Sequence, residues 1–301
     1  MATDRSLDRF DSVTGQGSRP AAWVNRLWRW LSIVLLHGIV IAGAILFLAP
    51  FYWMLTTSLK TDAQLFTFPP PLIPNPVEWS HYGNALDAVP LVRYFGNTLY
   101  LTILNVVGTL LSSSFVAFGF ARYSHVRGSR WLFALVLATM MLPFHITMIP
   151  LFIIYSKLGW VNTFRPLWIE AFFGGAFFIF LLRQFFRTIP TELFDAARID
   201  GASEVGQYWR IMVPLAKPAL TAVAIFQFQG TWNEFLRPLI YINRQAMKPL
   251  SLGLQDFYKT NTVEWQQLMA ASVLMVLPVV LVFFFLQRYF IRGIALTGMK
   301  G

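Results

Sequence analysis

The sequence of 301 residues contains no cysteine. This absence excludes disulfide bonds, cysteine-ligated metals and thiol nucleophiles, while it leaves the compartment open. Charged residues are also scarce, at 13%, whereas hydrophobic residues make up 56% and include 29 Phe and 11 Trp. Such a composition is typical of a membrane protein and argues against a soluble one.

Motifs of catalysis and nucleotide binding are missing as well. The dipeptide Gly-Lys never occurs, so the chain has no phosphate-binding loop of the G-x-x-x-x-G-K-[ST] type. No nucleophile–base arrangement stands out. The four histidines show no metal-ligand spacing; they are His37, His81, His125 and His145. We therefore expect no catalytic residue, no metal site, no cofactor bound by this chain and no enzymatic activity.

Long apolar runs are present, and they predict six membrane-spanning helices. A run of about 20 apolar residues crosses the roughly 30 Å hydrocarbon core as a helix, because a helix satisfies its backbone hydrogen bonds internally. The expected spans are 31–55, 94–120, 131–155, 167–187, 216–240 and 265–287. The predicted fold class is an all-α membrane bundle. Its domain of spans covers 31–287, between a partly disordered N-terminal segment, 1–30, and a C-terminal tail, 288–301.

The distribution of basic residues predicts the orientation. Of the 24 Lys and Arg residues, 16 lie in segments on the same side as the N-terminus. Basic residues favour the cytoplasmic side, so we expect both termini in the cytoplasm. The net charge of +10 is attributed to these loops and not to nucleic-acid binding. The segment 67–86, which contains five prolines, is expected outside as an extended and stiff loop.

The segment 190–214 is too polar to lie in lipid. We expect a first helix from Thr191, as its N-cap, to about Ile199, a turn at Asp200-Gly201, and a second helix capped by Ser203. The second helix places four residues on one apolar face, Val205, Tyr208, Trp209 and Met212. The pair is either an interfacial element resting on lipid headgroups or a docking element for a cytoplasmic partner. Adjacent alanines favour docking, because they let another backbone approach closely.

The residues of this segment carry a resemblance to a known family. Asp195-Ala196-Ala197, then Gly201 and Ile211-Met212-Val213-Pro214, are similar to the Glu-Ala-Ala loop of inner-membrane permeases of binding-protein-dependent ABC importers. "AARIDGAS", "RIMVPLAKPAL", "FYWMLTTSLKT", "GNTLYLT", "AFGFARYSHVRG", "TWNEFLRPLIYI" and "QRYFIRGIALTGMKG" resemble the carbohydrate-importer branch, the second-permease type of the maltose system. Asp195 stands where Glu is usual, which keeps the charge on a shorter arm.

The resemblance implies a function in transport. The chain would be a permease subunit of an ATP-driven importer of sugars or related polyols in a bacterial or archaeal plasma membrane. Its partners would be two ATP-binding ABC subunits that carry the ATP and Mg, a homologous second permease and an extracytoplasmic solute-binding protein. The 190–214 loop would couple to the ATPases. The coupling residues would be Glu192, Asp195, Ala196, Ala197, Arg198, Asp200 and Gly201. Two alternatives stay open: import of a sugar phosphate, amino acid or peptide, and a receptor or scaffold whose loop recruits a partner.

Polar residues in the fifth expected span are candidates for the translocation path. Polar groups inside spans are costly and often functional. Gln229, Trp232, Asn233 and Glu234 offer hydrogen-bonding groups and an aromatic face, which suit a sugar. The alternative role for these side chains is hydrogen bonding between helices.

Overall fold

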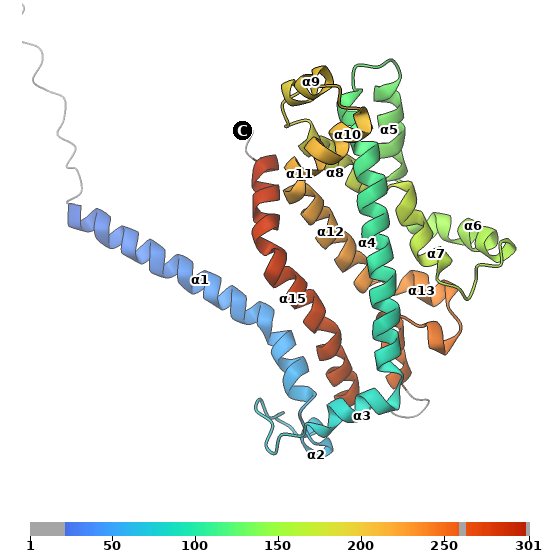
Figure 1. The fold of residues 1–301 in the computed structure, drawn as a ribbon. Helices are drawn as coiled ribbons and strands as arrows, with labels where there is room; N and C mark the ends of the chain where they lie inside the picture. The colour runs from blue at the N-terminus through green and yellow to red at the C-terminus, as the bar shows by residue number, and fades with distance from the viewer. Residues whose placement is uncertain (1–21, 259–262, 299–301) are drawn as a thin grey trace, which may run out of the picture. The chain divides into compact units, whose positions relative to one another are not determined.

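The computed structural model of the chain describes residues 22–258 and 263–298, and every regular element among them is a helix (Figure 1). The elements are α1 (Ala22–Thr57), α2 (Asp62–Leu65), α3 (Ser80–Ala88), α4 (Leu91–Arg122), α5 (Ser129–Thr139), α6 (Phe144–Lys157), α7 (Arg165–Trp168), η1 (Ile169–Phe173), α8 (Ala176–Phe186), α9 (Glu192–Ile199), α10 (Glu204–Gln207), η2 (Tyr208–Met212), α11 (Val213–Leu215), α12 (Lys217–Trp232), α13 (Leu236–Tyr241), η3 (Gln245–Met247), α14 (Leu250–Gly253), η4 (Leu254–Phe257) and α15 (Trp265–Gly298). The predicted all-α fold class is confirmed. The disorder expected for residues 1–20 concerns a segment outside the described residues.

The chain divides into two units, residues 1–53 and 54–301. In the first unit the described residues belong to α1, which contains the predicted span 31–55. The apolar stretch that begins at Arg29 is not buried by the protein. A helix that is apolar all round needs an apolar environment, and a lipid bilayer supplies it.

Of the six expected spans, four correspond to long apolar helices or helix runs in the described residues, and two crossings are bent. The four candidates are Arg29–Thr57, Leu91–Arg122, Arg165–Phe186 and Trp265–Gln287. Two bent pairs raise the number to six when each counts as one span: Ser129–Thr139 with Phe144–Lys157, at 91°, and Glu204–Leu215 with Lys217–Trp232, at 79°. The first bend lies at Pro143, which has no backbone N–H to continue a helix. The fifth expected span, 216–240, is interrupted because α12 ends at Trp232 and α13 begins at Leu236.

Helix α4 is central to the second unit, and α8, η1 and α12 pack against it. Its 32 residues extend about 48 Å at 1.5 Å per residue, more than the hydrocarbon thickness of a bilayer. The side-chain amide of Asn105 connects α4 to α7. It donates to the backbone oxygen of Leu101 in α4 at 2.8 Å and to that of Leu167 in α7 at 3.0 Å. Such bonds satisfy polar groups that lipid cannot satisfy. The result is a bundle with the α9–α10 pair at one end of α4 and α3 at the other (Figure 1).

Candidate functional site: a helix–turn–helix braced on α4

The segment 190–214 folds as two short helices joined by a glycine turn. Helix α9 ends at Ile199, and Gly201 adopts φ +81°, a left-handed conformation that favours glycine. The backbone N–H of Ala202 then closes the turn on the Ala197 oxygen at 2.8 Å. The Ser203 hydroxyl accepts a hydrogen bond from the Gly206 N–H at 3.2 Å. The predicted turn and the predicted Ser203 cap are therefore confirmed.

Two details of the sequence prediction need correction. Thr191 is the N-cap residue of α9, as predicted, but its side chain makes no capping hydrogen bond, because its backbone is helical (φ −69°, ψ −27°) and not extended. The apolar face of the second helix is also divided: Tyr208 and Met212 are buried, whereas Val205 and Trp209 are about half exposed. The helix forms a π turn over Tyr208–Met212, whose hydrogen bonds join residues five apart, so the angular spacing differs from that of an α-helix.

A buried aromatic side chain anchors α9 on the end of α4. Phe194 is 1% exposed, and its ring lies 6.3 Å from that of Phe118. The Arg122 guanidinium lies 4.5 Å above the Phe194 ring, a cation–π arrangement. The same guanidinium lies 3.8 Å from the Asp195 carboxylate. Arg122, the last residue of α4, thus contacts both Phe194 and Asp195.

A second contact ties the π turn to the middle of α4. The hydroxyl groups of Tyr208 and Ser114 lie 2.6 Å apart, and both side chains are 2% exposed. The Tyr208 ring packs edge-on against Phe115 and Phe118. These contacts of Phe194 and Tyr208 all end on α4, so this helix holds α9 and the π turn in place.

An ion pair closes the turn between the two short helices. Arg198 donates to the Glu204 carboxylate at 2.8 Å, and this hydrogen bond lowers the pKa of Glu204 and raises that of Arg198. Burial raises the pKa of the Tyr123 hydroxyl, just beyond the end of α4, and the Glu204 carboxylate raises it further. Glu204, at the start of α10, is thus paired with Arg198 of α9.

The expected coupling residues lie mostly on the outer surface of this pair. Six of them are exposed: Glu192, Asp195, Ala196, Arg198, Asp200 and Gly201. Ala197 is half-buried. Beside them Ile199 is 87% exposed, although it is apolar. The surface therefore combines small, apolar and charged side chains. Asp195, expected to meet an ATPase, has a partner within its own chain in Arg122.

The four residues expected in the translocation path have different surroundings. Trp232 is 1% exposed, and its indole N–H donates to the Met275 oxygen of α15 at 3.0 Å, which is the alternative role of helix–helix bonding. The Glu234 carboxylate accepts from the first backbone N–H groups of α13, at 3.1 and 3.3 Å. Gln229 and Asn233 are exposed, one turn apart. The Asn233 amide also donates to the Gln229 backbone oxygen at 2.9 Å, at the end of α12.

Sequence reasoning missed the residues that hold the loop in place. Phe194 lies inside the segment 190–214, yet a single apolar residue among polar ones gives no signal of its partner. In the sequence, Arg122 is one of 16 basic residues that indicate the cytoplasmic side, and Ser114 carries no signal of its own. These residues meet the loop across 73 to 94 positions of sequence, and nothing in one sequence pairs them.

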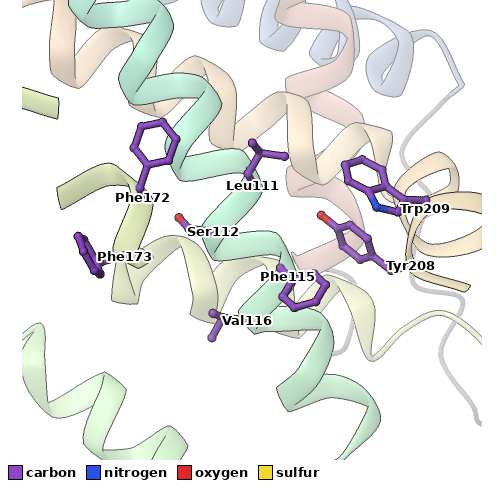
Figure 2. Close-up of a pocket in the computed structure, with 8 residues that line it drawn as sticks. All are labelled: Leu111, Ser112, Phe115, Val116, Phe172, Phe173, Tyr208 and Trp209. Atoms are coloured by element: carbon purple, nitrogen blue, oxygen red, sulfur yellow. The ribbon is translucent and has the colours of Figure 1, made fainter. Parts of the chain in front are cut away.

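An open hollow lies beside α4, between the π turn and η1. Figure 2 shows its lining, with Tyr208 and Trp209 at one side and Phe172 and Phe173 of η1 at the other. Its volume is about 520 Å³. The remaining lining residues come from α4: Leu111, Ser112, Phe115 and Val116. The π turn therefore contributes to the surface of the helix bundle as well as to the loop.

The described residues thus form an all-helical bundle with up to six candidate membrane spans, which holds a helix–turn–helix against the end of its central helix. The chain belongs to the family described as the inner membrane component of binding-protein-dependent transport systems, which matches residues 111–296.

Individual relatives agree with this membership. The chain is 40% identical over 208 residues to the arabinooligosaccharides transport system permease protein AraQ of Halalkalibacterium halodurans, which covers 69% of this chain and 74% of that protein. It is 30% identical over 275 residues to the diacetylchitobiose uptake system permease protein NgcG of Streptomyces coelicolor, with 90% and 89% covered. A solved bacterial ABC transporter involved in the import of the acidic polysaccharide alginate matches with a TM-score of 0.75 and 26% identity, over 89% of this chain and 98% of that one.

The predicted resemblance is thereby confirmed. The chain is a multi-pass inner-membrane permease of the carbohydrate ABC importer type, in a family whose transport depends on a binding protein. Permeases of this family are not themselves enzymes.

Proposed function

We propose that this chain forms part of the path for a sugar or related polyol, and that the α9–α10 pair couples the path to ATP hydrolysis in separate subunits. One observation carries the coupling role. An exposed surface with small and apolar side chains is held against α4 from behind by Phe194 and Tyr208. A pushed surface transmits movement only when it is attached rigidly to the element that must move, and these contacts provide the attachment.

The remaining partners follow from the coupling role. Two ABC subunits bind ATP and Mg, and a homologous second permease completes the membrane part. A solute-binding protein delivers the substrate. The surplus of Lys and Arg on one side, 16 of 24, supports cytoplasmic termini and a cytoplasmic α9–α10 pair. In this orientation the ATP-hydrolysing subunits meet the exposed face of α9.

In the path, Gln229 and Asn233 are the candidates for substrate contact. Both are exposed at the end of α12, where the helix breaks before α13. Hydroxyl groups of a sugar need donors and acceptors, and side-chain amides offer both. Trp232 and Glu234 support these two residues and do not contact the substrate themselves. Trp232 fixes α12 on α15, and Glu234 caps α13.

The docking role is tested by a charge at the most exposed apolar position of α9. We expect Ile199→Asp to leave the chain in the membrane and to lower substrate-stimulated ATP hydrolysis about tenfold or more, since about 1.4 kcal/mol of lost binding corresponds to that factor. Val126→Asp is the matched control, because Val126 is also exposed and apolar but lies in the loop after α4. The measurement is ATPase activity of the purified complex with and without substrate-loaded binding protein.

Equal activity of Ile199→Asp and the unchanged chain would contradict docking through α9. A receptor or scaffold role predicts that the cellular response survives a block of ATP hydrolysis, which uptake by an importer does not. Competition of labelled-sugar uptake by sugar phosphates, amino acids and peptides then tests the substrate class.

A further inference from the structure

The segment 66–79, between α2 and α3, carries large apolar side chains that are mostly exposed. Phe66 is 81% exposed, Phe68 93% and Ile73 75%. Leu72 and Trp79 are also mostly exposed. Monomeric proteins rarely present such a series of large apolar side chains to water unless it marks an interaction surface.

The ends of neighbouring spans hold this segment in place. The backbone N–H of Glu78 donates to the Leu59 oxygen at 3.0 Å, two residues beyond the end of α1. The Gln266 amide at the start of α15 donates to the Asp62 carboxylate at 2.7 Å. The next helix, α3, packs against α15. These contacts keep 66–79 at the level where the apolar spans begin and end, which is the interfacial region of a bilayer.

The chemistry of the segment suits that region. No charged residue occurs between positions 66 and 77. Asp62 and Glu78, which flank this stretch, are engaged with Gln266 and with Ser80. Five prolines lack the backbone N–H, so the irregular backbone enters the interface with fewer donors that lipid cannot satisfy. Aromatic side chains favour the same depth.

We propose that segment 66–79 inserts its apolar side chains into the lipid interface and anchors this end of the bundle to the membrane surface. Within 66–77 the exposed apolar side chains follow one another without an intervening charged residue. A soluble protein that docks reversibly meets polar rims with charged residues around an apolar centre, and the segment has no such rim of its own. A bilayer is therefore the partner that its chemistry fits.

The absence of cysteine makes the test direct. Phe68→Cys and Ile73→Cys each carry a nitroxide label in the complete transporter, reconstituted in phosphatidylethanolamine–phosphatidylglycerol nanodiscs. Asp87→Cys is the control, because Asp87 is exposed on α3 in the same region. The complex with the unsubstituted chain gives the labelling background. The measurement is the ratio of collision rates with oxygen, which concentrates in lipid, and with a water-soluble nickel chelate.

We expect a severalfold higher oxygen-to-nickel ratio at positions 68 and 73 than at 87, unchanged by added binding protein. Ratios equal to that at 87 would overturn the proposal, because the segment would then lie in water. Protection from both reagents would also overturn it, since a protein surface would then cover the segment. Such protection only after binding protein is added would identify that protein as the partner.

Discussion

The hydrogen bond between Tyr208 and Ser114 gives the sharpest test of how the coupling pair is held. The Ser114 hydroxyl has one hydrogen, and it donates this hydrogen to the Leu110 oxygen within α4. Because that hydrogen then serves the backbone of α4, we predict that the Tyr208 hydroxyl is the donor of the 2.6 Å bond between the two side chains. Both groups are buried, so water does not replace a missing partner.

This direction makes the two single substitutions unequal. Tyr208→Phe leaves Ser114 with its bond to Leu110, so the loss is that of one ordinary bond, about 0.5–1.5 kcal/mol. Ser114→Ala leaves the Tyr208 hydroxyl buried without a partner, which costs about 1–3 kcal/mol. Adding Tyr208→Phe to Ser114→Ala removes the stranded hydroxyl. The double variant is therefore expected to be more stable than Ser114→Ala alone.

The assay is the thermal midpoint of the purified complex, followed by tryptophan fluorescence, for the two single variants and the double variant. A change of 1 kcal/mol corresponds to about 2–4 °C in proteins of this size range. Stimulated ATP hydrolysis, measured in parallel, reports whether the loosened pair still transmits movement. A larger loss for Tyr208→Phe than for Ser114→Ala would refute the assigned direction. Additive losses in the double variant would refute the bond itself.

Three further expectations concern single positions. Gly201→Val is expected to lower the stability by about 1–2 kcal/mol, because Gly201 has a φ of +81° and not because space is lacking. Gly201→Asn is expected to lower it less, because asparagine tolerates this conformation better. Equal thermal midpoints of the two variants would contradict this explanation. The pKa of Glu204 is lowered by Arg198, so the ion pair stabilises the loop fully above the ordinary carboxyl pKa, and this stabilisation is lost as the pH falls through the lowered pKa. The thermal midpoint of Glu204→Gln should accordingly change less between pH 7 and about pH 3 than that of the unchanged chain, and parallel curves would count against the pair. Gly108→Ala is expected to destabilise the protein by about 1–3 kcal/mol, because the new Cβ would lie 2.7 Å from a phenylalanine ring of η1. Gly119→Ala has nothing within 4 Å of its Cβ and is expected to stabilise the helix by up to about 1 kcal/mol. The denaturation midpoints of the two variants should therefore shift in opposite directions.

Much of the fold could be predicted from the sequence, because the determining signals are local. The apolar run 31–55 is long enough to cross a bilayer and carries no charge, so it could be assigned without knowledge of any neighbour. Gly201 and Ser203 determine a turn and a cap through their own backbone and hydroxyl. The resemblance to the permease family likewise rested on residues that lie close together in the sequence.

Only the tertiary structure decided which residues hold the coupling pair. Ser114 and Tyr208 are 94 positions apart, and their contact depends on how α4 and the π turn pack. The same packing places Trp232 in the core while Gln229, three positions earlier on the same helix, is exposed. Local sequence determines whether a segment forms a helix or a turn. The direction in which a side chain faces depends on which other helices bury one side of that segment, and these come from distant parts of the chain.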